Sequence, residues 1–97
     1  MMNRKGKEMM KFEKLAVVGD VIRAYDFKPM AGRGDCYLEG KVISLGLTKA
    51  GFDGFTIEVT KTVFDDKVKE TVVGEIGYVP FEVSFMEYDG RVMNLSK

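Results

Sequence analysis

Alternation of apolar and polar positions is the main structural signal along this chain, and it predicts β-strands. The clearest example covers residues 55–63, where Phe, Ile, Val, Lys and Val alternate with Thr, Glu, Thr and Thr. β-Branched residues on both sides of this alternation are typical of a strand. Asp65 and Asp66 then favour a turn, and residues 68–73 are predicted to return as a hairpin partner with an exposed edge.

Two further strands are predicted on either side of a loop. Residues 21–27 carry apolar side chains on both faces, as expected in a closed barrel or at a sheet corner. Residues 36–45 are predicted to form the next strand, and Gly40 in its middle indicates a bulge or a sharp bend. Residues 30–35 contain two glycines close together, so they are predicted to form a loop.

Shorter extended segments complete the pattern. Residues 78–81 are predicted to be extended because Pro80 restricts the residue before it. Asp89 and Gly90 stand between two alternating runs, which is a strong hairpin signal. No stretch combines a helical period with capping residues. We therefore expect an all-β fold of about five to seven strands, either a small barrel or a strongly bent antiparallel sheet.

Length and composition fit a single folded domain. The chain has 97 residues, of which 45% are hydrophobic, enough for one domain with a core of its own. Residues 1–13 show no clean period and are predicted to be a basic flexible tail, and residues 14–97 to be the domain. We hypothesise that translation starts at Met9 or Met10, because the peptide before them could be encoded by a purine-rich ribosome-binding site.

Missing residue types exclude several kinds of chemistry. The chain has no histidine and one cysteine, Cys36. Histidine-based nucleophilic triads, cysteine-rich metal cages and an intramolecular disulfide are therefore impossible within one chain. No phosphate-binding glycine loop and no calcium-loop spacing is present. We predict a protein that is not an enzyme and that needs no cofactor and no metal.

The start of the predicted domain resembles a known family. Gly19, Asp20 and Val21, then Arg23 to Tyr25, then Tyr37 to Val42 resemble the first hairpin of Src-homology-3-like barrels of the Tudor and KOW kind. Those barrels begin with a Gly-Asp turn, continue through a strand with aromatic residues and return through a Gly-Lys-Val type of strand. The match covers about a quarter of the chain. It implies a small Src-homology-3-like barrel that acts as a binding module.

A second resemblance covers more of the chain. Residues 24–30, 79–85 and 89–93 look like segments of small uncharacterised proteins of marine cyanobacteria and their phages. This likeness implies that the protein comes from such organisms or their phages, and it gives no information about its activity.

Aromatic and charged residues gather in and beside the first long loop. They are Tyr25, Phe27, Lys28, Arg33, Asp35 and Tyr37. If the flanking strands pair across the loop, Tyr25 or Phe27 lies close to Tyr37. We predict a ligand-binding surface with the three rings as an apolar platform and the three charges as polar specifiers. The alternative is that the rings pack the barrel mouth and the charges keep the loop solvated.

These observations favour a cytoplasmic interaction module that binds a protein or peptide through this loop. If a phage encodes it, the compartment is the host cytoplasm. Net charge is zero, which disfavours the first alternative, nucleic-acid binding through the basic tail. The second alternative is a histidine-independent enzyme. No apolar run is long enough to span a membrane. Exposed strand edges allow either a monomer or a homodimer.

Overall fold

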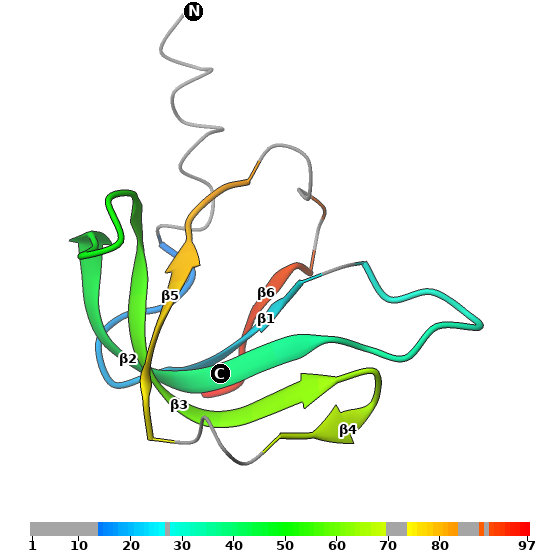
Figure 1. The fold of residues 1–97 in the computed structure, drawn as a ribbon. Helices are drawn as coiled ribbons and strands as arrows, with labels where there is room; N and C mark the ends of the chain where they lie inside the picture. The colour runs from blue at the N-terminus through cyan, green and yellow to red at the C-terminus, as the bar shows by residue number, and fades with distance from the viewer. Residues whose placement is uncertain (1–13, 27, 70–73, 84–87, 89) are drawn as a thin grey trace, which may run out of the picture.

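The computed structural model describes residues 14–26, 28–69, 74–83, 88 and 90–97. Within these residues the chain forms strands and no helix, so the predicted all-β class is confirmed. The strands are β1 (Val21–Tyr25), β2 (Tyr37–Leu47), β3 (Asp53–Phe64), β4 (Lys67–Val68), β5 (Ile76–Pro80) and β6 (Val92–Asn94) (Figure 1). The predicted tail at residues 1–13, the ring of Phe27 and most of the predicted return strand at residues 68–73 lie outside the described residues.

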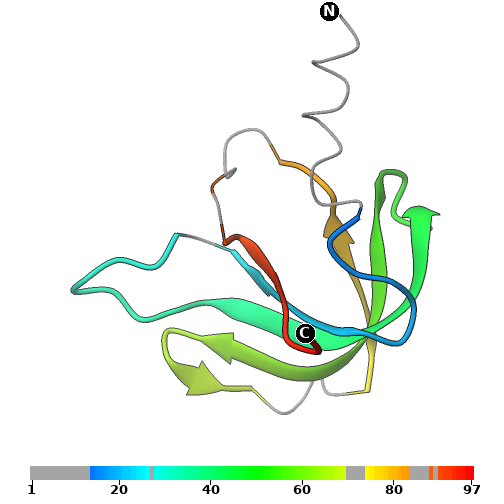
Figure 2. The same cartoon turned by 180° about the vertical axis from the view of Figure 1, so that it is seen from behind.

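The described strands form one antiparallel sheet with the order β4-β3-β2-β1-β6. β5 pairs with β3 as well, beyond the short stretch that β4 occupies. β6 comes last in the chain and returns to pair with β1 (Figure 2). The sheet bends strongly and is not closed. Its six strands agree with the predicted number, and its form is the second of the two expected ones, a strongly bent antiparallel sheet.

The bend is produced where β2 and β3 change register. The pairing shifts between Glu39 and Gly40 and again between Val42 and Ser44. A Cβ atom on Gly40 would lie 2.6 Å from the Glu58 carbonyl oxygen, so only glycine allows β3 to approach this closely. The irregularity predicted at Gly40 is confirmed as a register shift, and its extra residue lies on β3. Beyond it, the β2–β3 hairpin stands up from the rest of the sheet (Figure 1).

The core fills the concave side of the bent sheet. Its buried side chains come from β1, β2, β3, β5 and β6 and from two flanking segments. The rings of Phe55 and Phe81 meet edge to face, with centroids 5.0 Å apart. Thr60 is the extra residue at the register shift between β2 and β3. Before it, alternate residues of β3 point into the core: Phe55, Ile57 and Val59. After it, Lys61 lies opposite Glu39 on the other side of the sheet. We call that convex side the outer face.

One cation is buried beside this core. Arg91 is 2% exposed, and its Nη2 donates to the carbonyl oxygens of Pro80 (3.0 Å) and Phe81 (3.1 Å). Those two bonds connect the end of β5 to the start of β6, which do not pair with each other. The guanidinium thus holds the two ends of the bent sheet together. Among the described residues, no helix is long and apolar enough to cross a membrane.

Candidate binding site at the β1–β2 loop

Two tyrosines meet at the base of the loop that joins β1 to β2. Tyr25 and Tyr37 are register partners, and their ring centroids lie 5.3 Å apart at an angle of 58°. Both side chains are half-buried. A tilted aromatic pair at this separation is attractive beyond its burial of area. The close approach expected from strand pairing is confirmed.

A third residue lies against this pair. The Arg23 guanidinium carbon is 4.2 Å from the centroid of the Tyr37 ring, and Nη1 donates to the Tyr25 hydroxyl at 3.2 Å. Nε donates to Oε2 of Glu39 at 2.7 Å, which makes an ion pair between register partners. Burial alone would lower the pKa of Arg23, but the hydrogen bonds to Tyr25 and Glu39 outweigh it and raise this pKa. The guanidinium therefore stays charged and covers part of the predicted aromatic platform.

The end of the loop is fastened to the β3–β4 turn. Asp35 N–H donates to Oδ1 of Asp66 (2.8 Å), and Asp66 N–H donates to the Asp35 carbonyl oxygen (2.9 Å). Asp65 N–H donates to Sγ of the buried Cys36 at 3.4 Å. Gly34 packs so tightly that a Cβ atom there would lie 2.6 Å from the Asp65 carbonyl carbon. Loop and turn therefore form one structural unit.

The turn itself owes its shape to two aspartates. Asp65 and Asp66 have φ values of 56° and 66°, in the left-handed region that a two-residue hairpin turn uses at both central positions. Aspartate tolerates this region better than most residues with a side chain, because its short carboxylate can bond to nearby backbone. Here the Asp66 carboxylate bonds to the facing loop instead of its own strand. The turn is thereby both the end of a hairpin and the support of the loop.

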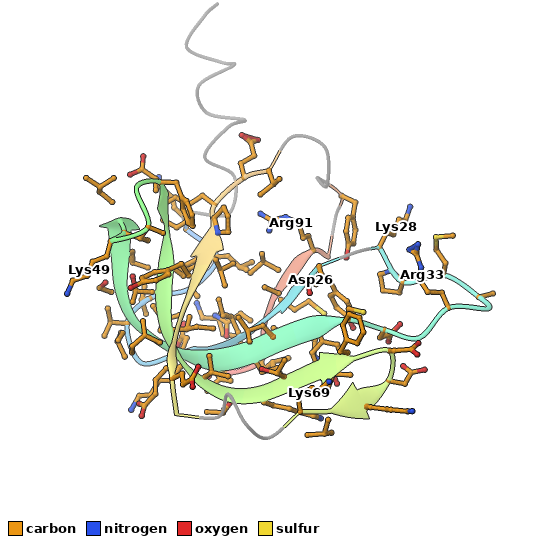
Figure 3. The ribbon with its side chains drawn as sticks, viewed as in Figure 1. Asp26, Lys28, Arg33, Lys49, Lys69 and Arg91 are labelled. Carbon is orange, nitrogen blue, oxygen red and sulfur yellow. The ribbon has the colours of Figure 1, made fainter. Side chains whose placement is uncertain are left out.

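The tip of the loop is exposed, in contrast to its base. Residues 28–33 are all exposed, and Met30 retains 55% of its surface. Nη1 of Arg33 approaches the Met30 sulfur at 3.9 Å, and Arg33 N–H donates to the Met30 carbonyl oxygen at 3.3 Å. Lys28 and Arg33 both belong to this projecting segment (Figure 3). The tip thus presents two cations and a thioether on a fixed base.

The other side of the loop base carries a third tyrosine. Nζ of Lys28 lies 6.0 Å from the centroid of the Tyr88 ring. Burial raises the pKa of the Tyr88 phenol, and the neighbouring Tyr25 hydroxyl adds to the shift. Burial also raises the pKa of Asp26. The residue as a whole is exposed, but neighbouring groups partly exclude water from its carboxylate. The Tyr88 phenol and the Asp26 carboxylate are therefore both partly desolvated.

The six predicted site residues occupy different parts of this arrangement. Tyr25 and Tyr37 come together at the base, Lys28 lies over Tyr88, Arg33 stands at the tip and Asp35 holds the turn through its backbone. Phe27 lies outside the described residues.

Sequence reasoning missed three participants: Arg23, Glu39 and Tyr88. The sequence did contain a signal for Arg23 and Glu39, since the strand pairing that joins Tyr25 to Tyr37 also places these two residues opposite each other. No sequence pattern pointed to Tyr88.

The described residues of the site are not arranged to bind a metal ion. Within the described residues, no group of three or more cysteine, aspartate and glutamate side chains could hold an ion. Asp35 and Asp66 lie close together, but their bonds join one backbone amide to one carboxylate. Cys36 is buried and accepts a backbone N–H, as a small buried residue does.

The chain matches no protein-family model, and no curated protein and no solved structure is significantly similar to it.

Proposed function

We propose that the protein is a non-enzymatic interaction module that binds a protein or peptide partner through the loop between β1 and β2. The binding surface, which we call the loop surface, comprises the exposed tip at residues 28–33 together with Tyr25, Tyr37 and Tyr88. The observation that carries the proposal is the contrast within the loop: its tip is exposed, while its base is fastened to the β3–β4 turn by one backbone–backbone and one backbone–carboxylate hydrogen bond.

A fastened base matters because binding costs entropy when the binding segment must first be ordered. The bonds between Asp35 and Asp66 already restrict the loop before a partner arrives. Tyrosine, arginine and methionine are also the side chains that protein interfaces favour. Met30 and Arg33 supply two of these types at the tip, and the tyrosines supply the third at the base.

The charges of the loop surface indicate the chemistry of the partner. Lys28 and Arg33 are the cations of the tip, whereas Asp35 lies at the base, half-buried and bonded to the turn. A partner segment with an acidic residue next to an apolar one would pair its charge with the tip and its apolar side chain with Met30. We therefore propose an acidic–apolar protein segment as the partner, with the cytoplasm as its compartment.

Comparative capture tests this function. The tagged protein and its Arg33→Ala and Lys28→Ala variants are used to retrieve partners from the source cell, and Lys67→Ala serves as the control. Lys67 is an exposed cation of β4, outside the loop surface. We expect the main partner to be retained by the wild type and by Lys67→Ala and reduced in both loop variants. Equal retention by all four proteins would contradict the proposal.

The predicted resemblance to Src-homology-3-like barrels fits such a role. This resemblance and the likeness to the cyanobacterial and phage proteins both stay predictions. Nucleic-acid binding through residues 1–13 depends on a segment outside the described residues. A salt titration distinguishes it from the proposed function, because affinity for nucleic acid falls steeply with ionic strength.

A further inference from the structure

Three hydroxyl side chains form a row on the outer face of the sheet, far from the loop surface. Ser44 of β2 is the register partner of Thr56 of β3, which is in turn the partner of Tyr78 of β5. Register partners in neighbouring strands point to the same face and lie about 5 Å apart. The row therefore places three hydroxyl-bearing side chains on one face, across three neighbouring strands.

The row forms the floor of a pocket of about 340 Å³. Ile43, Leu47 and Ile76 form an apolar rim, and Thr48 and Lys49 close the end at the hairpin turn. The three rim residues are exposed by 42%, 78% and 49%, so their side chains lack cover from the described part of the chain. The volume lies at the lower end of the range typical of small-ligand sites.

The floor hydroxyls have no other task within the described structure. Thr48 is engaged, since its Oγ1 donates to the Phe52 carbonyl oxygen (2.8 Å) and accepts the Ala50 N–H (3.2 Å). Among the described residues, no hydrogen bond involves the hydroxyl of Ser44, Thr56 or Tyr78. Three available donors above a sheet, flanked by an apolar rim, are suited to oxygen acceptors on an otherwise apolar molecule.

The charge of the lining residues indicates which of these molecules the pocket favours. Among the described lining residues, Lys49 is the one charged side chain and none carries a carboxylate. The next row along the sheet contains Lys41 opposite Glu58, so its charges balance. An ammonium and three hydroxyls together favour an anion with several oxygen atoms. We propose that this pocket binds a small amphiphilic monocarboxylate, whose carboxylate faces Lys49 and the hydroxyl row and whose apolar part lies against Ile43 and Ile76.

The pocket and the loop surface are separate. Lys49 stands at the hairpin, on the opposite side of the molecule from Lys28 and Arg33 (Figure 3). No described residue belongs to both sites. A failure of one proposal therefore leaves the other intact, and each can be tested with variants that do not touch the other.

Hexanoate is a suitable probe because it combines one carboxylate with a short apolar chain. The full-length protein, labelled with ¹⁵N, is titrated with hexanoate, and amide chemical shifts are followed. Hexanol and hexylammonium are the matched controls for charge. We expect saturable shifts at Ser44, Thr56 and Tyr78 with hexanoate, weaker binding of hexanol and none of hexylammonium. No saturable shift at these amides, or equal binding of all three probes, would overturn the proposal.

Two variants test the assigned roles. Lys49→Gln removes one exposed charge and should weaken hexanoate binding roughly two- to fivefold. Tyr78→Phe removes one hydroxyl and should weaken it roughly two- to tenfold. Lys67→Gln removes an equal charge from β4 and should leave binding unchanged. Lys49→Gln and Lys67→Gln proteins that bind hexanoate equally would contradict the role of Lys49.

Discussion

Replacement of Gly34 by alanine tests whether the loop is fastened to the β3–β4 turn. The new Cβ atom would lie 2.6 Å from the carbonyl carbon and 2.8 Å from Cα of Asp65. Both are backbone atoms of a tight turn and cannot rotate away, so loop and turn must separate. Overpacking of this kind costs about 1–3 kcal/mol. The two bonds between Asp35 and Asp66 would be strained or lost as part of that cost.

The sign of this effect is diagnostic. At an unconstrained site whose φ suits alanine, Gly→Ala stabilises a protein by about 0.4–1 kcal/mol, because it reduces the entropy of the unfolded chain. We therefore expect Gly34→Ala to lower Tm by roughly 5–20 °C, measured by thermal denaturation followed by circular dichroism. Ala31→Ser, at the exposed tip, is the control and should leave Tm nearly unchanged.

A double-mutant cycle sharpens the test. Asp66→Gly removes the carboxylate that accepts the Asp35 N–H and tolerates the left-handed φ. Alone, it should cost about 1 kcal/mol. In the Gly34→Ala background it should cost less, because the loop has already moved away from the turn. A Tm of Gly34→Ala at or above that of the wild type, with an unchanged Asp66 amide shift, would refute the reasoning.

Four further predictions concern the frame of the sheet and the pH dependence of its stability. Arg91→Met leaves two carbonyl oxygens without their donor and should lower the free energy of unfolding, measured by urea denaturation, by about 2–5 kcal/mol. A loss below about 1 kcal/mol would contradict the role of Arg91 in holding β5 and β6 together. Gly54→Ala would place Cβ 2.9 Å from Cα of Pro80, so it should destabilise β5 pairing and hasten amide exchange in β5, and unchanged exchange would count against this reading. Burial raises the pKa of Asp26, so the contribution of this group to stability is present at acid pH and is lost as pH rises through the folded-state pKa. Asp26→Asn should therefore raise Tm near neutral pH and leave it unchanged at acid pH. The hydrogen bond from Asn94 lowers the pKa of Asp20, so Asp20→Asn should do the reverse: it should lower Tm near neutral pH, with the difference vanishing as pH falls through the folded-state pKa.

Local pattern was sufficient where the structure is decided by neighbours in sequence. The alternation over residues 55–63 predicted β3, and Gly40 in an otherwise strand-like stretch predicted a bulge. The pairing of Tyr25 with Tyr37 followed from two strands joined by one loop. Each of these features depends on a period of two or on a residue with an unusual backbone range, and both are visible in a single sequence.

Pattern failed where contacts join distant segments. The shift at Thr60 moves Lys61 and Val63 to the outer face, although their spacing continues that of Ile57 and Val59. A sequence reading would place Arg91 at the surface, because its carbonyl partners are ten and eleven residues away and depend on the fold.

The pocket was invisible for a similar reason. Its hydroxyl row exists only because β5 pairs with β3, and β5 follows β3 only after an intervening strand, β4. Ser44 and Thr56 belong to one hairpin, but Tyr78 reaches them through this long-range pairing. A single sequence gives no register for such a pair.

Amide hydrogen exchange of the protein bound to its captured partner is the measurement that tests the central claim most directly. If the partner binds the loop surface, amide protons at residues 28–33 and at Tyr37 should exchange more slowly in the complex. The hairpin residues around Lys49 should exchange as they do in the free protein. Protection that appears only in the β2–β3 hairpin, or in no part of residues 28–37, would contradict a partner site at the β1–β2 loop.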